Sequence, residues 1–271
     1  MIELVEAWYK YPRSDGDALK NVSVSFNLGQ ATAIVGQNGA GKSTLIRLLN
    51  GLLKPTSGRV LLDGKDINQI PSKVVTRRVG VVFQNPNHQL FSATVLDEVS
   101  FALKNFEYPE DEIRKLSSVA LARLNLSGFE TRSPFTLSSG ERKRLAIASV
   151  VVYTPDFLVF DEPTVGQNLS NRHKIGTLIR EYVSAGKSVI ASTHDMDFAL
   201  EYFGRVIVLN GGRLVMDSTP VQLMSDAEAM RSNGIVPPER HYLEALMRAV
   251  DYSGQYEPER LAERIIQVVD S

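Results

Sequence analysis

The stretch Gly36-Gln37-Asn38-Gly39-Ala40-Gly41-Lys42-Ser43-Thr44 decides how this chain is interpreted. Residues 31–35, just before it, form a nearly continuous apolar run that is typical of a strand buried on both faces of a parallel sheet. After it, leucines recur at helical spacing, at Leu45, Leu48, Leu49 and Leu52. The sequence therefore predicts a buried strand, a glycine-rich turn and a helix, in that order.

This arrangement suits a bound triphosphate. Backbone N–H groups of such a loop point at phosphate oxygens, and the following helix adds its positive N-terminal end. The glycines at 36, 39 and 41 permit close approach and unusual φ angles. The pattern G-x-x-x-x-G-K-[ST] assigns Lys42 to the β- and γ-phosphates and the Ser43 hydroxyl to Mg²⁺. The bare pattern arises by chance in about 1% of chains of this length, and its strand and helix context lowers that figure.

A second motif follows a later apolar strand. Residues 157–160 lead directly into Asp161-Glu162-Pro163. An aspartate at the end of a buried parallel strand can hold the Mg²⁺ shell, and the adjacent Glu162 can polarise a water for in-line attack. Two acids at a strand end are otherwise ordinary loop residues. Beside a phosphate loop, the catalytic interpretation is the stronger one.

The composition is that of an ordinary globular chain. The 271 residues are 43% apolar, and 30 Lys plus Arg against 31 Asp plus Glu give a formal net charge of −1. No field of one sign exists to attract a polyanion. The absence of cysteine excludes disulfides, thiolate metal sites and a cysteine nucleophile. The N-terminus lacks a signal-peptide pattern and no apolar stretch approaches the ~18 residues of a membrane span, so we expect a soluble cytoplasmic chain.

Strands and helices alternate along the chain. Apolar patterns predict strands over 2–5, 22–26, 157–160, 188–192 and 206–209, and helices over about 109–124, 140–153 and 171–185. Such alternation favours an α/β fold with a mostly parallel sheet. The basic cluster Arg142-Lys143-Arg144 is expected on a solvated helix face. Residues after 235 are expected to form an appendage with two short amphipathic helices.

A third motif, Leu137-Ser138-Ser139-Gly140-Glu141, lies just before the second of these helices. With this turn ahead of the aspartate strand, the chain resembles the nucleotide-binding subunit of an ABC transporter over residues 1 to about 230. The resemblance implies an α/β P-loop NTPase with a RecA-like core, an N-terminal antiparallel β subdomain and a helical subdomain inserted at about 86–150. The nucleotide-binding domain would span 1–234, and a small C-terminal helical extension that helps dimerisation would span 235–271.

The resemblance assigns further residues to an ATP site. Tyr11 falls where the family stacks an aromatic ring on adenine, a contact worth ~1–3 kcal/mol, and Tyr9 is the alternative. Gln84 matches a glutamine that touches Mg²⁺ and the attacking water and links to the membrane subunit, and His194 matches a histidine that contacts the γ-phosphate. The expected catalytic residues are Glu162, His194 and Gln84, and the expected Mg²⁺ ligands are Ser43, Gln84 and Asp161.

In this family, the signature turn binds the γ-phosphate held by the other subunit. Ser138 and Gly140 would do so here, which implies a dimer with two composite sites. Ser139 and Glu141 stand where the family usually has glycine and glutamine. Ser139 should stiffen the turn slightly, and Glu141 places a carboxylate early in the helix, where the helix dipole favours it.

The loop after Asp161-Glu162-Pro163 departs further from the family pattern. At this subunit interface it contains Gly166 and, in place of the usual aspartate, Asn168. Asn168 keeps hydrogen-bonding capacity but loses a charge. Whether the two sites are equivalent, and whether the dimer is homomeric, therefore stays open.

Residues 83–95, FQNPNHQLFSATV, resemble those of the energy-coupling factor (ECF) group of importers, as does the tail after residue 235. The resemblance implies an ATPase that energises the import of a vitamin or a transition-metal ion. Its partners would be a second ABC ATPase subunit, a transmembrane scaffold and a substrate-binding membrane protein, without nucleic acid. It would lie peripherally on the cytoplasmic face of the cell membrane.

Two other functions stay open at this point. One is a soluble ABC ATPase that acts on nucleic acid or the ribosome, against which the near-neutral charge and the single cassette argue. The other is a catalytically weak regulatory ABC subunit, which the substitutions at Ser139 and Asn168 suggest.

Overall fold

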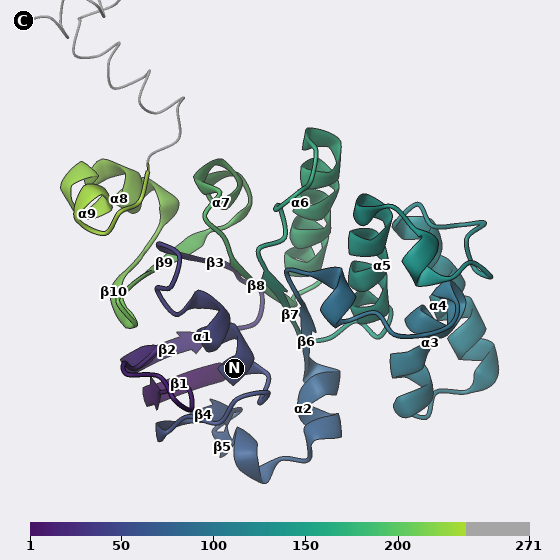
Figure 1. The fold of residues 1–271 in the computed structure, drawn as a ribbon, viewed down its shortest axis with the longest axis horizontal. Coiled ribbons are helices and arrows are strands. Elements are labelled where there is room, and N and C mark those ends of the chain that lie inside the picture. The colour runs from purple at the N-terminus through teal and green to yellow at the C-terminus, as the bar shows by residue number, and fades with distance from the viewer. Residues whose placement is uncertain (237–271) are drawn as a thin grey trace, which may run out of the picture.

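The computed structural model describes residues 1–236, which contain two sheets (Figure 1). The smaller sheet is antiparallel with the order β2-β1-β4-β5, built from β1 (Ile2–Tyr9), β2 (Leu19–Phe26), β4 (Ser57–Leu62) and β5 (Lys65–Asp66). The larger sheet has the order β10-β9-β3-β8-β7-β6, built from β3 (Ala31–Val35), β6 (Val79–Val82), β7 (Phe157–Asp161), β8 (Ser188–Ser192), β9 (Arg205–Asn210) and β10 (Arg213–Ser218). Only β10 runs antiparallel to its neighbour in this larger sheet, among the residues described. The mostly parallel sheet and the antiparallel N-terminal sheet predicted above are confirmed.

Helices cover the larger sheet and gather beyond its β6 edge. The helices are α1 (Lys42–Leu49), α2 (Ser72–Arg78), α3 (Val95–Asn105), α4 (Glu110–Arg123), α5 (Ser139–Val151), α6 (Leu169–Ser184), α7 (Met196–Tyr202), α8 (Pro220–Ser225) and α9 (Ala227–Ser232). Helices α3, α4 and α5 pack on one another at one end of the molecule (Figure 1). The limits 86–150 for an inserted subdomain stay a prediction. The extension is predicted to begin at residue 235, and its residues 237–271 lie outside the part of the chain that the structure describes.

The central strand β3 is buried on both faces because its side chains alternate between two apolar cores. Ile34 packs with the α1 side chains Leu45 and Leu48 and with the small sheet. Ala33 and Val35 face the second core, which contains apolar residues of α3 to α7. A strand surrounded in this way has a fixed register, and the loop that follows it begins at a fixed place.

Two helix ends differ from the sequence prediction. Helix α1 ends at Leu49, so Leu52 lies outside it and is exposed. Helix α4 begins at Glu110, so Pro109 is its N-cap rather than its first residue. Helix ends depend on local capping geometry, which apolar spacing does not encode.

The expectation of a solvated basic face on α5 is wrong. Lys143 is only 3% exposed, and Arg142 donates hydrogen bonds to the carbonyls of Leu137 and Phe135. Consecutive residues on an α-helix point about 100° apart. Three adjacent basic residues therefore cannot share one face, and the middle one points into the protein.

Helices α6 and α7 make a tight contact in the second core that the sequence pattern does not predict. A Cβ built on Gly176 of α6 would lie 2.0 Å from Cε1 of the Tyr202 ring on α7. Tyr202 is itself buried, and its hydroxyl is hydrogen-bonded to Nδ1 of His173 at 2.8 Å. The absence of a side chain at position 176 is thus what lets α7 lie close to α6.

We predict that Gly176→Ala destabilises the protein, although alanine is the better helix former by about 1 kcal/mol. Forcing a methyl group into a filled core typically costs ~1–3 kcal/mol, and the Tyr202 ring has to move. Thermal unfolding measures the effect, with Gly204→Ala as the control, because nothing lies within 4 Å of a Cβ at Gly204. A Gly176→Ala protein as stable as the control would contradict the prediction.

Candidate nucleotide site

The phosphate loop is shaped by two glycines that lie against backbone carbonyls. Gly36 has φ 149°, and a Cβ there would lie 2.2 Å from the carbonyl oxygen of Leu209 in β9. Gly41 has φ 102°, and its Cβ would lie 2.5 Å from the carbonyl oxygen of Ala18. Any other residue would be both strained and blocked at these positions. The unusual φ angles predicted for the glycines at 36 and 41 are therefore observed, and the close approach seen here is to backbone carbonyls of the protein itself.

Lys42 and Glu162 face one another at the base of this loop. The Lys42 Nζ donates to the carbonyls of Gly36, at 2.8 Å, and Gln37, at 3.2 Å, and lies 3.8 Å from Glu162 Oε1. The other carboxylate oxygen, Oε2, lies 2.8 Å from Nδ1 of His194. The Glu162 side chain is 9% exposed and that of His194 is 61% exposed. A single buried carboxylate thus joins the end of β7 to the loop after β8.

Glu162 also has an unusual backbone. Its φ is 49°, in the left-handed region, and its N–H donates to the carbonyl and the hydroxyl of Ser192, both at 3.1 Å. Left-handed backbone costs a non-glycine residue about 1 kcal/mol or more. The bonds to β8 hold this conformation, which aims the carboxylate at Lys42.

Asp161, the residue before Glu162, accepts hydrogen bonds from two hydroxyl groups. Its Oδ1 accepts hydrogen bonds from Ser43 Oγ at 3.0 Å and from Ser192 Oγ at 2.6 Å. The strand β7 thereby connects to the first turn of α1 and to β8. A hydroxyl and a carboxylate of this kind are suitable ligands for a hard cation such as Mg²⁺. In residues 1–236, no group of three or more His, Cys, Asp or Glu side chains gathers into a metal site of its own.

A cavity of about 440 Å³ opens over the loop. Its lining includes many of the predicted site residues, namely Tyr11, Asn38, Gly39, Gly41, Lys42, Ser43, Thr44, Gln84, Glu162 and His194. Ala40 is buried beneath the loop, and its carbonyl accepts a hydrogen bond from the N–H of Gly212. Motifs far apart in the sequence therefore meet at one cavity.

The two tyrosines proposed for adenine differ in position. Tyr11 lines the cavity, and its hydroxyl lies 3.1 Å from Thr44 Oγ1 in a hydrogen bond. Tyr9 is buried in β1, with its ring edge-on to that of Tyr11 at 4.8 Å between centroids. Tyr11 is thus the one of the two that can reach a ligand in the cavity.

The rest of the loop packs on a segment that the sequence did not point to. Gly36 and Gln37 line a neighbouring cavity together with Gly234 and Ile235. A Cβ on Gly234 would lie 1.6 Å from Gln37 Nε2. Asn233, the residue before it, accepts a hydrogen bond from Asn210 at 3.0 Å. The segment after α9 therefore touches the outer side of the phosphate loop.

The signature turn forms a helix cap. Ser138 is the N-cap of α5, its Oγ accepts from the N–H of Glu141, and the Glu141 carboxylate accepts from the N–H and hydroxyl of Ser138, both at 2.7 Å. These bonds hold the pKa of Glu141 below its ordinary value. The pattern S-x-x-E predicts such a capping box, in addition to the helix-dipole effect expected for Glu141. Neither Ser138 nor Gly140 lines the cavity over the phosphate loop, whereas Ser139 lines the adjacent one with Gln84.

Asn168 has a local role that its position could have indicated. Its side chain caps α6 by accepting a hydrogen bond from the N–H of Asn171 at 2.9 Å. Gly166, two residues earlier, has φ 70° and open space around its Cβ position. Asparagine is among the best N-cap residues, so its position just before a helix predicts that it caps that helix. The substitution for aspartate therefore preserves the turn.

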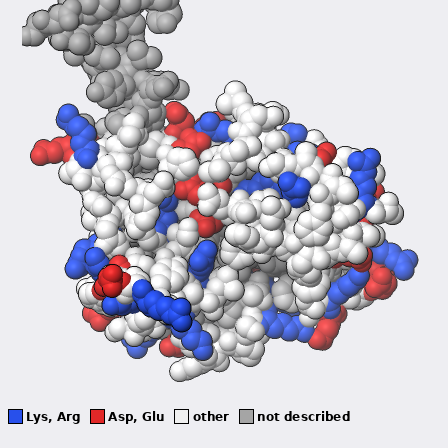
Figure 2. Space-filling model, in the orientation of Figure 1, with Lys and Arg blue, Asp and Glu red and all other residues white. Residues whose placement is uncertain are grey.

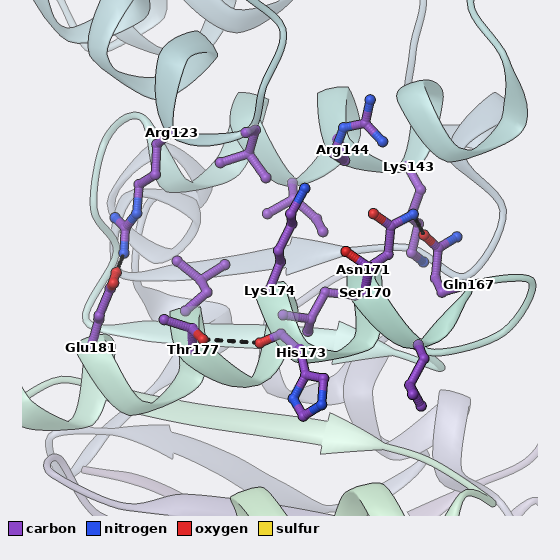
Figure 3. A pocket seen from close by; sticks show the side chains of 15 residues that line it. Arg123, Lys143, Arg144, Gln167, Ser170, Asn171, His173, Lys174, Thr177 and Glu181 are labelled. Carbon is purple, nitrogen blue, oxygen red and sulfur yellow. Dashed lines mark hydrogen bonds and ion pairs between the residues drawn. The ribbon is translucent and has the colours of Figure 1, made fainter.

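A separate cavity of about 610 Å³ lies between α5 and α6 (Figure 3). Its polar side chains are partly paired with one another, Gln167 with Asn171 at 3.1 Å and Arg123 with Glu181. Within the described part of the chain, it contains no residue predicted for the nucleotide site. This cavity is therefore distinct from the phosphate loop.

The surface carries no dominant charge on the face drawn in Figure 2, where Lys and Arg alternate with Asp and Glu. This agrees with the formal net charge of −1. Of the helices in residues 1–236, none has the length and apolar character needed to cross a membrane.

A glycine loop between a buried parallel strand and a helix, with a lysine inside and a strand-end carboxylate opposite, defines a P-loop nucleotide-binding protein. The ABC transporter family profile matches residues 19–165. The chain belongs to this family.

Several relatives carry the ECF designation. The energy-coupling factor transporter ATP-binding protein EcfA of Methanothermobacter thermautotrophicus is 40% identical over 234 residues, which are 85% of this chain and 75% of that protein. The EcfA protein of Methanocaldococcus jannaschii is 37% identical over 250 residues, 91% of this chain and 89% of that protein. A relative from Methanosarcina acetivorans is 41% identical over 229 residues, and the chain spans only 37% of its length.

Solved structures agree with these relatives. CbiO1 of Clostridium perfringens, part of the ABC transporter complex cbiONQ, is 38% identical with a TM-score of 0.74, covering 90% of this chain and 98% of that one. A dimeric ATP-binding cassette in a post-hydrolysis state with ADP and phosphate is 30% identical with a TM-score of 0.74, covering 81% of this chain and 99% of that one. The predicted ABC cassette fold is confirmed.

We predict that Glu141→Ala lowers the free energy of unfolding by about 1 kcal/mol because it removes half of the capping box. Since the pKa of Glu141 is lowered by folding, its contribution is present above the unfolded-state pKa and is lost as pH falls through the folded-state pKa. Denaturant unfolding should therefore give a stability difference from wild type that shrinks in acid. Glu141→Gln is the control, because it keeps an acceptor that does not titrate. An equal difference at neutral and acid pH would contradict the prediction.

Proposed function

We propose that this chain binds and hydrolyses ATP, with Mg²⁺, and thereby energises import by an ECF-type ABC transporter. The observation that carries the proposal is the position of the Glu162 carboxylate, buried beside the phosphate loop between Lys42 Nζ at 3.8 Å and His194 Nδ1 at 2.8 Å. A regulatory subunit without catalysis would not need this strained, buried acid. We therefore favour an active ATPase over a catalytically weak one.

Each residue has a defined task in this proposal. The loop from Gly36 to Thr44 surrounds the phosphates with its N–H groups, and Lys42 neutralises the β- and γ-phosphates. Glu162 accepts the proton of the attacking water. Because an ionised carboxylate only accepts hydrogen bonds, Nδ1 of His194 carries a hydrogen when it is bonded to Glu162. Phosphate oxygens also only accept, so a contact between Nε2 and the γ-phosphate requires a hydrogen on Nε2 as well, as in the imidazolium. Tyr11 stacks on adenine.

The donors for Mg²⁺ are Ser43, Asp161 and Gln84. Ser43 and Asp161 are already hydrogen-bonded, and Gln84 lines the same cavity as Ser43. When bound with ATP, the cation would neutralise charge on the β- and γ-phosphates. Gln84 would also orient the attacking water, which is why its place relative to Glu162 matters.

The site is proposed to be completed by a second ATPase subunit. The signature residues Ser138 and Gly140 lie outside the cavity of their own phosphate loop, and Ser138 is exposed. This turn can therefore face another subunit's γ-phosphate, which would replace the Glu141 carboxylate as the acceptor for the Ser138 hydroxyl. Helix α5 starts at this turn and adds its positive end. The interface loop with Gly166 and Asn168 would contact the same partner.

The assembly proposed is that of an importer. Residues 1–234 would form the nucleotide-binding domain, with the helical subdomain at 86–150 and a dimerising extension at 235–271. A transmembrane scaffold and a membrane protein that binds a vitamin or a transition-metal ion would hold the ATPase at the cytoplasmic face of the membrane. The support is the 37–40% identity to proteins named EcfA and the likeness to CbiO1 of the cbiONQ complex.

We predict that Lys42→Ala weakens ATP binding by about 10- to 100-fold, since charge-assisted hydrogen bonds contribute about 1.5–3 kcal/mol. Glu162→Gln should instead keep ATP binding and lower kcat by about 10²- to 10⁴-fold, the range for loss of a general base. Equilibrium binding and phosphate release measure these effects. Glu112→Gln, an exposed acid on α4, is the matched control. Wild-type turnover in the Glu162→Gln protein would refute the assignment of the base.

We further predict that the Glu162→Gln protein changes from monomer to dimer when MgATP is added, because each ATP then stays bound between the phosphate loop of one subunit and the signature turn of the other. Light scattering with and without MgATP gives the mass. The Lys42→Ala protein serves as the control and should stay monomeric. A Glu162→Gln protein that binds ATP and stays monomeric would show that this chain alone does not complete the sites, so that its partner is a different ATPase.

A further inference from the structure

A buried lysine joins the signature helix to the glutamine loop, here defined as residues 83–85. Lys143 is 3% exposed, and its Nζ donates to the carbonyl oxygens of Phe83, at 3.0 Å, and Gln84, at 3.1 Å. Figure 3 shows Lys143 and Arg144 leaving α5 in different directions. Lys143 thus lies beneath the loop that carries Gln84.

The side chain of Gln89 also links the glutamine loop to α5 by hydrogen bonds. Gln89 accepts a hydrogen bond from the N–H of Phe83 at 3.1 Å, and its amide donates to the carbonyl of Ala146 at 2.7 Å and to Ser149 Oγ at 3.1 Å. Both backbone groups of Phe83 are therefore tied to α5, one through Lys143 and one through Gln89. The loop before Gln84 follows the position of this helix.

Stability alone does not explain a lysine at this position. In the described part of the chain the hydrogen-bond partners of its buried ammonium are the neutral carbonyls of Phe83 and Gln84. A buried charge without a paired partner is costly, and an apolar side chain of similar size is often as stable or more stable. An unfavourable group that remains in a core commonly serves function.

We propose that Lys143 is a positioning residue that fixes Gln84 relative to the signature helix. Ser138, which is proposed to contact the partner's nucleotide, caps this helix. Gln84, which is proposed to act on the subunit's own nucleotide, is held by the same helix through Lys143. One rigid helix therefore positions residues for both nucleotides. A shift of α5 produced by the partner's nucleotide would reach Gln84 through the Lys143 hydrogen bonds. The inference rests on the proposed function, from which Gln84 and Ser138 take their roles.

The test compares Lys143→Met with wild type in the full chain. Methionine keeps the length and the apolar stem and removes the donors. We expect ATP binding and KM near wild-type values, an unfolding midpoint that is equal or higher, and a kcat lower by about 10- to 100-fold, as for a misplaced catalytic group. Lys143→Arg keeps charge and donors and should recover part of kcat. Lys115→Met, at an exposed position on α4, is the control.

Hydrogen exchange of a peptide covering residues 83–89 is the second measurement, and it does not depend on turnover. We expect faster exchange in Lys143→Met than in wild type and no change in Lys115→Met. Wild-type kcat in Lys143→Met, a loss of kcat matched by a fall in the unfolding midpoint, or unchanged exchange would each overturn the inference. If wild type binds but does not hydrolyse ATP, the proposed function fails, while the exchange data still decide whether Lys143 holds the loop.

Discussion

The phosphate loop has its shape because two of its glycines lie against backbone carbonyls from other parts of the fold. Gly36 meets Leu209 at the end of β9, and Gly41 meets Ala18 at the start of the small sheet. The loop is thus held from both sides, by the parallel sheet and by the antiparallel one. The order of strands around β3 matters for this reason, since it places those carbonyls where only glycine fits.

The same sheet brings the other parts of the site to one edge. Strands β7 and β8 run parallel to β3, so their carboxyl ends deliver Asp161, Glu162 and His194 beside the loop. Ser192 Oγ donates a hydrogen bond to Asp161 and accepts one from the N–H of Glu162, which fixes these strand ends to each other. Parallel strands gather residues from distant sequence positions in this way.

Patterns of residue type predict much of the fold and of the candidate site. The features that they do not predict depend on contacts between residues far apart in the sequence. The strand at 31–35 and the loop at 36–44 were readable because apolar runs and glycine spacing follow from local physics. Lys143 was expected in solvent because a basic cluster carries no sign of which member turns inward. Gly176 and the segment at Gly234 were also missed, since their neighbours Tyr202 and Gln37 lie far away in the sequence. The capping box at Ser138, by contrast, depends only on the local pattern S-x-x-E and is predictable from the sequence.

The backbone of Glu162 has a consequence for how such a chain can change over evolutionary time. With φ at 49°, this position would suit glycine or asparagine better than glutamate, because both adopt the left-handed region more easily. A single substitution there would remove the carboxylate while relieving strain. A relaxed backbone alone would favour such a substitution, whereas the proposed reaction requires the carboxylate. Descendants that keep the fold and lose the reaction are one mutation away.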